Sequence, residues 1–428
     1  MTIAMLIGTL LICLAIRIPV AIALGLASVL TLMLFGNQSL LSLAQRFFHA
    51  MEVYPLLAAP FFILAGTFLT TGGVARRLID FAVALTSWVR GGLAMGCVLA
   101  CMLFAAISGS SPATVVAIGS IAIAGMVAAG YSREYATGVI TNAGTLGILI
   151  PPSIVMVVYG AITETSIGAL FMAGVLPGLI LTVAMMIVIH LLARRDVAQQ
   201  QHTKTSLREV IRTGRAAFWG LLLIVIILGG IYGGVFTPTE AAAVSAVYAM
   251  IVAVFEYRDL RPRQIPAVLI ESVRLTTMLM FIVANAYLFS FVLTTEQIPQ
   301  SLSAAVLAME LPPWAFLLLI NVILLIAGNL MDPTSVVLIL APIIFPLAIG
   351  LGIDPVHLGV IMVVNMEIGM VTPPVGLNLF VASGVSGLSI VSVIRASLPW
   401  LLLLLGFLML VTYVPSISLF LPGLMLSG

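Results

Sequence analysis

Long stretches without a charged side chain are the feature that most restricts the fold of this chain. No Asp, Glu, Lys or Arg occurs between Arg90 and Arg133. Hydrophobic residues make up 62% of the 428 residues and charged residues only 7%, whereas a soluble domain is about one quarter charged. A helix needs ~20 mainly apolar residues to cross a bilayer. The pattern therefore predicts an all-α polytopic membrane protein, since a membrane β-barrel would show short alternating segments instead.

Composition and charge also exclude several classes of function. A net charge of +2, without a basic stripe outside short loops, indicates no nucleic-acid partner. The single lysine, Lys204, has no phosphate-binding loop around it, which excludes that route of ATP hydrolysis. The cysteines Cys13, Cys97 and Cys101 lie in apolar runs without zinc-ligand or disulfide spacing. No cleavable signal peptide is expected, because no basic residue precedes Arg17.

The basic residues predict which ends of the helices face the cytoplasm, because cytoplasmic loops carry the excess of Lys and Arg. The polar stretch 194–215 holds the densest cluster and is expected inside. Its basic residues are Arg194, Arg195, Lys204, Arg208, Arg212 and Arg215. Counting spans from this loop also places Arg133 and the amphipathic stretch 74–90 inside.

The same count predicts the outer segments. Glu164 and residues 233–240 fall outside, and the segment 267–293 ends outside. Arg46 also falls outside, as an exception to the charge rule. The side of the N-terminus is left open.

An internal repeat is the strongest signal in the sequence. Residues 108–116 match residues 329–337, with a shared proline and Val-Val pair, at a spacing of 221 positions (108 to 329). Residues 147–152 match residues 369–374, with a shared glycine and Pro-Pro pair, at a spacing of 222 (147 to 369). The span count makes the first copy enter from inside and the second from outside. Inverted repeats are typical of secondary transporters, whose binding site lies near the middle of the bilayer.

In both copies, small residues and proline interrupt an apolar segment. Such a break is tolerated only inside protein or beside a wet cavity, because lipid cannot pair with free backbone groups. We therefore predict re-entrant helical hairpins with tips at 108–114 and 329–335, and spanning helices that unwind at 142–152 and 365–374. Proline frees upstream carbonyls, which with Ser, Thr and Asn oxygens suit a hard cation, and half-helix N-termini suit a carboxylate. Two copies predict two cation sites with an anion site between them, without deciding between Na⁺ and H⁺.

Two acidic residues fall within these segments. A charge such as Asp332 at mid-membrane costs ~2.5–3.5 kcal/mol, so it is expected either to cap the following helix or to bind the ion. Glu367 is interpreted as a structural hydrogen-bonding residue, with a proton site and a helix–helix partner as alternatives. Asn142, Asn365 and Asn378 flank the breaks and are candidate side-chain ligands.

Four motifs resemble those of the large membrane subunit of TRAP (tripartite ATP-independent periplasmic) transporters. They lie at residues 108–114, 144–153, 237–241 and 365–378, and the resemblance covers essentially the whole chain. It implies a carrier in the bacterial inner membrane rather than an enzyme. Such carriers use a Na⁺ gradient, with no other cofactor, to import an organic acid from a periplasmic substrate-binding protein. They also pair with a small four-helix membrane subunit, expected here as a separate chain.

The resemblance further implies an elevator-type movement of a transport domain (93–165 and 314–390) against a scaffold (1–92, 166–313 and 391–428). The first cation site is expected at Ser110, Ser111, Asn142, Gly144 and Gly147. The second is expected at Asn329, Asp332, Thr334, Gly369 and Thr372. Substrate contacts are expected from Ser108, Gly109, Pro112, Thr145, Pro151, Pro152, Asn329, Pro373 and Asn378.

Other functions fit parts of the pattern. A stand-alone carboxylate/cation symporter would share the architecture and need no binding protein. An intramembrane hydrolase would need a serine beside a general base. Ser110 and Ser111 are available, but His190 and His357 have no motif context. A passive channel fits inverted hairpins less well than alternating access does.

Overall fold

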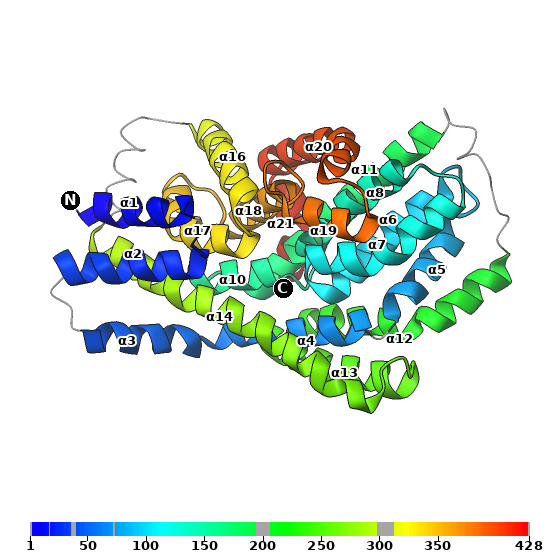
Figure 1. The fold of residues 1–428 in the computed structure, drawn as a ribbon, viewed down its shortest axis with the longest axis horizontal. Coiled ribbons are helices and arrows are strands. Elements are labelled where there is room, and N and C mark those ends of the chain that lie inside the picture. The colour runs from blue at the N-terminus through cyan, green and yellow to red at the C-terminus, as the bar shows by residue number, and fades with distance from the viewer. Residues whose placement is uncertain are drawn as a thin grey trace.

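The computed structural model describes residues 2–16, 18–35, 40–71, 73–193, 206–297 and 312–426. Within these residues the secondary structure is helical, without a strand (Figure 1). Ten helical segments of the described part are long and apolar enough to cross a membrane. This confirms the prediction of an all-α polytopic protein. Arg194, Arg195 and Lys204, which were used to predict orientation, and Arg17, which was used for the signal-peptide prediction, lie outside the described residues.

Helices from the first third and the middle of the chain form one group. It contains α1 (Thr2–Ala15), α2 (Val20–Phe35), α3 (Leu40–His49), α4 (Ala58–Thr71), α5 (Val74–Thr86), α12 (Leu207–Tyr232), α13 (Pro238–Ile251) and α14 (Ile265–Thr295). α4 packs along α13, and α14 packs along α2. Both helices bury several alanines, whose small side chains let two backbones approach closely. Short 3₁₀ turns η1 (Ala50–Glu52) and η2 (Tyr54–Leu57) connect α3 to α4.

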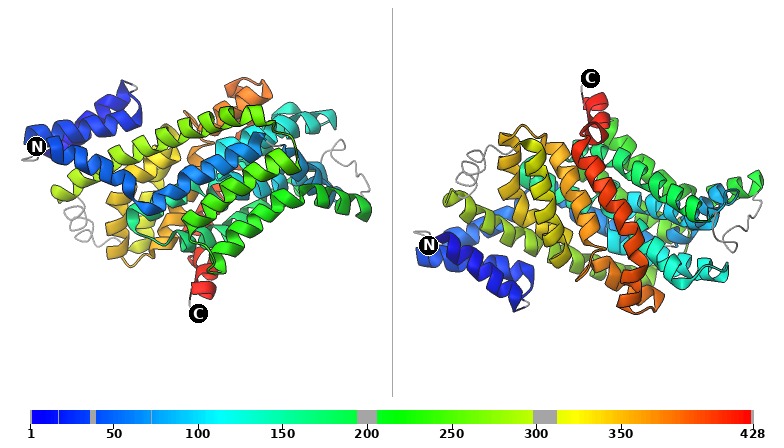
Figure 2. Two further views of the ribbon diagram at one scale, coloured as in Figure 1. Left: turned by 90° about the horizontal axis from the view of Figure 1, so that it is seen from below. Right: turned by 90° about the horizontal axis from the view of Figure 1, so that it is seen from above.

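The two sequence repeats fold into the same series of elements. The first copy has the hairpin α6 (Gly92–Ser108) and α7 (Ser111–Ala128), a broken helix, and the long α11 (Ile167–Ala193). The broken helix consists of α8 (Arg133–Ala143), α9 (Leu146–Leu149) and α10 (Ile154–Thr163). The second copy has the hairpin α16 (Pro313–Leu330) and α17 (Pro333–Gly350), the broken helix α18 (Pro355–Gly369) and α19 (Leu377–Ser386), and α20 (Ile390–Tyr413), followed by α21 (Ser416–Leu426). α4, α13 and α14 cover one face of the molecule, and α16 and α20 cover the opposite face (Figure 2).

The two broken helices run antiparallel. At one end, the Arg133 guanidinium at the start of α8 donates a hydrogen bond to the carbonyl oxygen of Ser386 at the end of α19 (3.1 Å). At the other end, the Tyr159 hydroxyl in α10 donates to the carbonyl oxygen of Pro355 at the start of α18 (2.8 Å). This is the arrangement that an inverted repeat requires.

Contacts between distant helix ends agree with the predicted sides. His190, which lies just before the predicted inner stretch 194–215, is 3.2 Å from the carbonyl oxygen of Arg90 in the predicted inner stretch 74–90. Arg77, in the predicted inner stretch 74–90, pairs with Asp259, and its guanidinium carbon lies 3.9 Å from the centre of the Tyr257 ring, which puts the α13–α14 connection on the same side. The assignment of α11 and α20 to the scaffold stays a prediction. α11 packs against α6 and α21, and α20 packs against α8 and α18, so each of them contacts a helix of the predicted transport domain.

The orientation makes a testable prediction. With Cys introduced at Val235, a membrane-impermeant maleimide is expected to react from the outside of intact cells, because this exposed residue lies in the predicted outer corner. With Cys at Arg212, reaction is expected only after the membrane is opened. The native Cys13, Cys97 and Cys101 are buried, so the unsubstituted chain serves as the low-background control. The opposite labelling pattern would overturn the orientation.

Candidate functional site

The tip of the first hairpin lies against the first helix break. α6 ends at Ser108, and Gly109 follows with a φ of +62°, in the left-handed region that glycine adopts readily. A Cβ at this position would lie 2.7 Å from the carbonyl oxygen of Pro152. The Ser108 hydroxyl stays within the tip, 3.1 Å from the hydroxyl of Thr114. The close backbone contact explains why only a glycine fits here.

Most residues of the predicted first cation site meet at this contact. The Ser111 hydroxyl donates to the carbonyl oxygen of Gly144, where α8 has ended (2.9 Å). A Cβ on Gly147 would lie 2.6 Å from the carbonyl oxygen of Ser110. Asn142 occupies the last turn of α8, beside the same break. The Pro151-Pro152 peptide bond that follows is cis, as is Pro373-Pro374.

The second hairpin meets the second break in a similar way. A Cβ on Gly369, at the end of α18, would lie 2.6 Å from the carbonyl carbon of Gly328. Gly328 directly precedes Asn329, so Asn329 and Gly369, two residues of the predicted second cation site, lie close together. Among the described residues, no side-chain hydrogen bond joins Thr334 in the tip to the break, and the Thr372 hydroxyl donates to the carbonyl oxygen of Ile368 (2.7 Å) rather than to the tip.

Asp332 has a structural task in this geometry. One of its carboxylate oxygens accepts a hydrogen bond from the backbone N–H of Ser335 (3.0 Å), and the other accepts from the Ser335 hydroxyl. Asp332 is therefore the N-cap of α17, where a carboxylate also interacts favourably with the helix dipole. Of the two roles foreseen for Asp332, capping is the one that these contacts describe.

Two hydrogen bonds join the copies at the centre of the site. The Asn378 side-chain amide donates to the Ser111 hydroxyl oxygen (2.7 Å), which links α19 to the tip of the first hairpin. The Thr145 hydroxyl lies 2.8 Å from a carboxyl oxygen of Glu367. The polar groups of both copies thus converge on one region of the protein interior.

Several oxygens in this region are buried without a hydrogen-bond donor among the described residues. They are the side-chain oxygens Oδ1 of Asn142, Asn329, Asn365 and Asn378, and Oε2 of Glu367. A buried acceptor left unpaired costs about 1–3 kcal/mol, so such a cluster favours a bound cation or a donor from a substrate. Four of these oxygens belong to side-chain amides and one to a carboxyl group, and such oxygen ligands suit hard cations rather than transition metals.

The predicted substrate contacts differ in burial. Pro112, Asn329 and Pro373 are half-buried, while Ser108, Gly109, Thr145, Pro151, Pro152 and Asn378 are buried. Asn321 was not predicted. Its side-chain oxygen Oδ1 accepts a hydrogen bond from the Asn365 side-chain amide (2.8 Å), and its own side-chain amide donates to the Thr412 hydroxyl (2.9 Å). An isolated Asn within an apolar segment was the signal that could have identified it.

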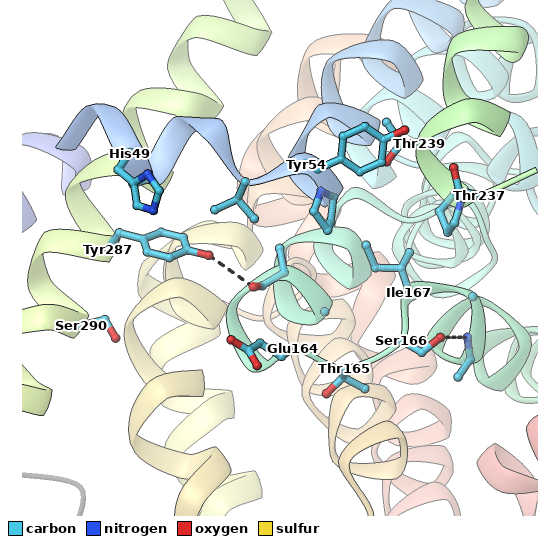
Figure 3. A pocket seen from close by; sticks show the side chains of 18 of the residues that line it. His49, Tyr54, Glu164, Thr165, Ser166, Ile167, Thr237, Thr239, Tyr287 and Ser290 are labelled. Atoms are coloured by element: carbon cyan, nitrogen blue, oxygen red, sulfur yellow. Dashed lines mark hydrogen bonds between the residues drawn. The ribbon is translucent and has the colours of Figure 1, made fainter. Parts of the chain in front are cut away.

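A separate pocket of about 930 Å³ opens between α14, the α10–α11 turn, the start of α13 and the α3–α4 connection (Figure 3). All four segments were assigned to the outside. Arg46 and Glu164 line it, and the Arg46 guanidinium carbon lies 3.7 Å from the centre of the Phe291 ring. The Tyr287 hydroxyl donates to the carbonyl oxygen of Ala161 across it (3.3 Å). We call this space the outer pocket.

Comparison with known proteins gives one family. Residues 7–417 match the model of the family described as the tripartite ATP-independent periplasmic transporter, DctM component. The chain is 62% identical to the C4-dicarboxylate TRAP transporter large permease protein DctM of Pseudomonas aeruginosa, over 94% of each chain. It is 41% identical to the isethionate TRAP transporter permease protein DctMQ of Oleidesulfovibrio alaskensis, over 96% of this chain and 65% of that longer protein.

A solved structure shares the fold. The YdaH transporter of Alcanivorax borkumensis superposes with a TM-score of 0.65, over 96% of this chain and 97% of that one, at 16% sequence identity. At this identity the likeness concerns the fold alone.

Proposed function

Because the chain belongs to the DctM family of tripartite ATP-independent periplasmic transporters, we propose that it is the permease subunit of a Na⁺-coupled importer of a C4-dicarboxylate. The chain is a multi-pass protein of the bacterial inner membrane, and its relatives are named as transporter permeases rather than enzymes. The substrate class is supported by the name of the relative with 62% identity. The observation that carries the proposal is the convergence of both hairpin tips and both helix breaks on one buried polar region.

The oxygen atoms available as ligands at each helix break support Na⁺ as the coupling ion. In each copy, a hairpin tip lies against backbone carbonyls beside a helix break. Neutral oxygens from Ser111, Asn142 and Gly144 at the first break can replace the water shell of a hard monovalent cation. We assign the second cation to the equivalent contact of Asn329 and Gly369. The carboxylate of the substrate would lie between the two cations, near Thr145 and Asn378.

An elevator movement is supported by how the copies are joined. Among the described residues, four side-chain hydrogen bonds tie the first copy to the second, between Arg133 and Ser386, Tyr159 and Pro355, Ser111 and Asn378, and Thr145 and Glu367. These bonds hold hairpins and broken helices in one unit, which would move as a rigid body past α4, α13 and α14. The outer pocket lies where this unit meets α13 and α14, and we propose it as the entrance for the substrate.

The proposed partners are a periplasmic substrate-binding protein and a small membrane subunit. Relatives of similar length are named large permease proteins, a name that implies a smaller companion. The longer relative named DctMQ, of which this chain covers 65%, supports the same arrangement.

Uptake into proteoliposomes tests this function. The chain and its small partner would be reconstituted, and labelled succinate would be supplied on a substrate-binding protein under an inward Na⁺ gradient. Accumulation that needs both the gradient and the binding protein is the expected result. Accumulation without the binding protein would support the stand-alone carboxylate/cation symporter instead. Uptake that does not depend on the Na⁺ gradient would contradict the proposal that Na⁺ is the coupling ion.

A further inference from the structure

Thr145 and Glu367 occupy equivalent positions of the two copies. Their spacing of 222 residues is the spacing that relates Gly147 to Gly369. Because the broken helices run antiparallel, an approximate two-fold axis relates the copies. Two equivalent positions are equally far from such an axis, so a pair in hydrogen-bond contact must flank it. The 2.8 Å contact between Thr145 and Glu367 therefore marks the centre of symmetry between the two breaks.

The Glu367 carboxyl depends on this contact. Both side chains are completely buried. Among the described residues, Thr145 is the only hydrogen-bond partner of the carboxyl, whose second oxygen has none. Loss of the Thr145 hydroxyl would leave a fully buried carboxyl without any partner, which is more costly than loss of a bond between two exposed groups.

The Thr145 hydroxyl also forms a hydrogen bond with the backbone of the first break. It lies 2.7 Å from the backbone carbonyl oxygen of Asn142, which can only accept a hydrogen bond. A hydroxyl that bonds to two groups has one proton to donate, so a change in either bond alters the strength of the other. Asn142 and Gly144 belong to the first break, whereas Glu367 lies two residues before Gly369 at the second. A cation that draws on the carbonyls of the first break is thereby connected to the backbone of the second.

We propose that the hydrogen bond between Thr145 and Glu367 couples the two cation sites, so that a cation in one site raises the affinity of the other. Both residues act as positioning residues and need not touch the ions. The inference rests on the proposed function, because it requires a cation in each copy.

The measurement is the Na⁺ dependence of uptake by the complete transporter. For the unmodified chain, a Hill coefficient approaching about 2 is expected, the limit for two coupled sites. Thr145→Val has nearly the same shape but no hydroxyl. It is expected to lower the coefficient to about 1 and to raise the half-saturating Na⁺ concentration about 10-fold. Thr145→Ser retains the hydroxyl and is expected to retain the cooperativity.

Thr141→Val is the matched control. Thr141 lies one turn earlier in α8 and is equally buried, but its hydroxyl donates within the helix, to the carbonyl oxygen of Thr137 (2.6 Å). Its Hill coefficient should equal that of the unmodified chain. The Na⁺-dependent rise in melting temperature of the purified complex provides a second readout that does not need transport.

The outcomes separate this inference from the proposed function. Uptake independent of Na⁺ would overturn the coupling ion of the proposed function and the inference with it. Na⁺-dependent uptake with a Hill coefficient of 1 in the unmodified chain, or unchanged cooperativity in a folded Thr145→Val variant, would overturn only the coupling. A reduced coefficient in Thr145→Val, with normal values in Thr145→Ser and Thr141→Val, would support it.

Discussion

Replacing Gly147 with alanine is expected to reduce Na⁺-driven uptake at least about 100-fold, because a displacement of about 1 Å at a reacting or binding site has an effect of this size. A Cβ there would lie 2.6 Å from the carbonyl oxygen of Ser110 and 2.7 Å from its carbonyl carbon. These are backbone atoms of the hairpin tip and cannot rotate away as a side chain could. The tip must therefore move off the break, which separates Ser111 from the Gly144 carbonyl. Initial uptake rates at saturating substrate and Na⁺ provide the measurement.

Gly125→Ala is the matched control for this prediction. Gly125 lies in α7 of the same hairpin, and a Cβ there would meet no atom within 4 Å. Alanine is also the better helix former, so this variant should fold and transport normally. If Gly147→Ala transported as well as Gly125→Ala, the close contact between tip and break would not be needed for function. The same comparison applies to Gly369→Ala with Gly384→Ala in the second copy.

The helix breaks could be predicted from the sequence because their causes are local. Pro-Pro pairs remove backbone donors wherever they occur, and residues 150 to 153 and 370 to 376 lie outside regular helix. The predicted unwound stretches, 142–152 and 365–374, begin too early, because residues 142–143 still belong to α8, 146–149 form α9, and 365–369 still belong to α18. The hairpin tips were predicted for the same reason, since small residues and proline cannot continue an apolar helix without cost. The repeat spacing then indicated that each tip belongs with one break.

The pairing of side chains across the copies could not be predicted in this way. Thr145 and Glu367 are 222 residues apart, and nothing in either local sequence indicates that one bonds to the other. The contact depends on the antiparallel packing of two broken helices, which is a property of the assembled fold. The link from Asn321 to Asn365 and the outer pocket, with walls from four separate segments, have the same origin. Local chemistry thus predicted which backbone groups are free, while tertiary packing determines what they contact.

Ser111 carries the second prediction of large effect. Its hydroxyl donates to the Gly144 carbonyl oxygen and accepts from the Asn378 amide, so one side chain joins a hairpin tip, a broken helix and the other copy. Ser111→Ala leaves the buried Asn378 side-chain amide unpaired, at a cost of about 1–3 kcal/mol, while the Gly144 carbonyl oxygen keeps its hydrogen bond from the Gly147 N–H (3.0 Å). Asn378 would then retain no side-chain hydrogen bond among the described residues, because its Oδ1 already has none.

We expect the lost hydrogen-bond energy to destabilise mainly the cation-bound state. A loss of about 2.8 kcal/mol corresponds to a 100-fold higher half-saturating Na⁺ concentration, which is the change expected for Ser111→Ala. Titration of uptake against Na⁺ measures it. Ser120→Ala is the control, because this exposed hydroxyl in the same helix has, in the part of the chain that the structure describes, one hydrogen bond, to the carbonyl oxygen of Ala117 (3.2 Å). The effects of Ser111→Ala and Asn378→Ala should be markedly non-additive, since both remove one shared bond. Additive effects, or normal Na⁺ affinity in Ser111→Ala, would contradict a cation site where the first hairpin tip meets the first helix break.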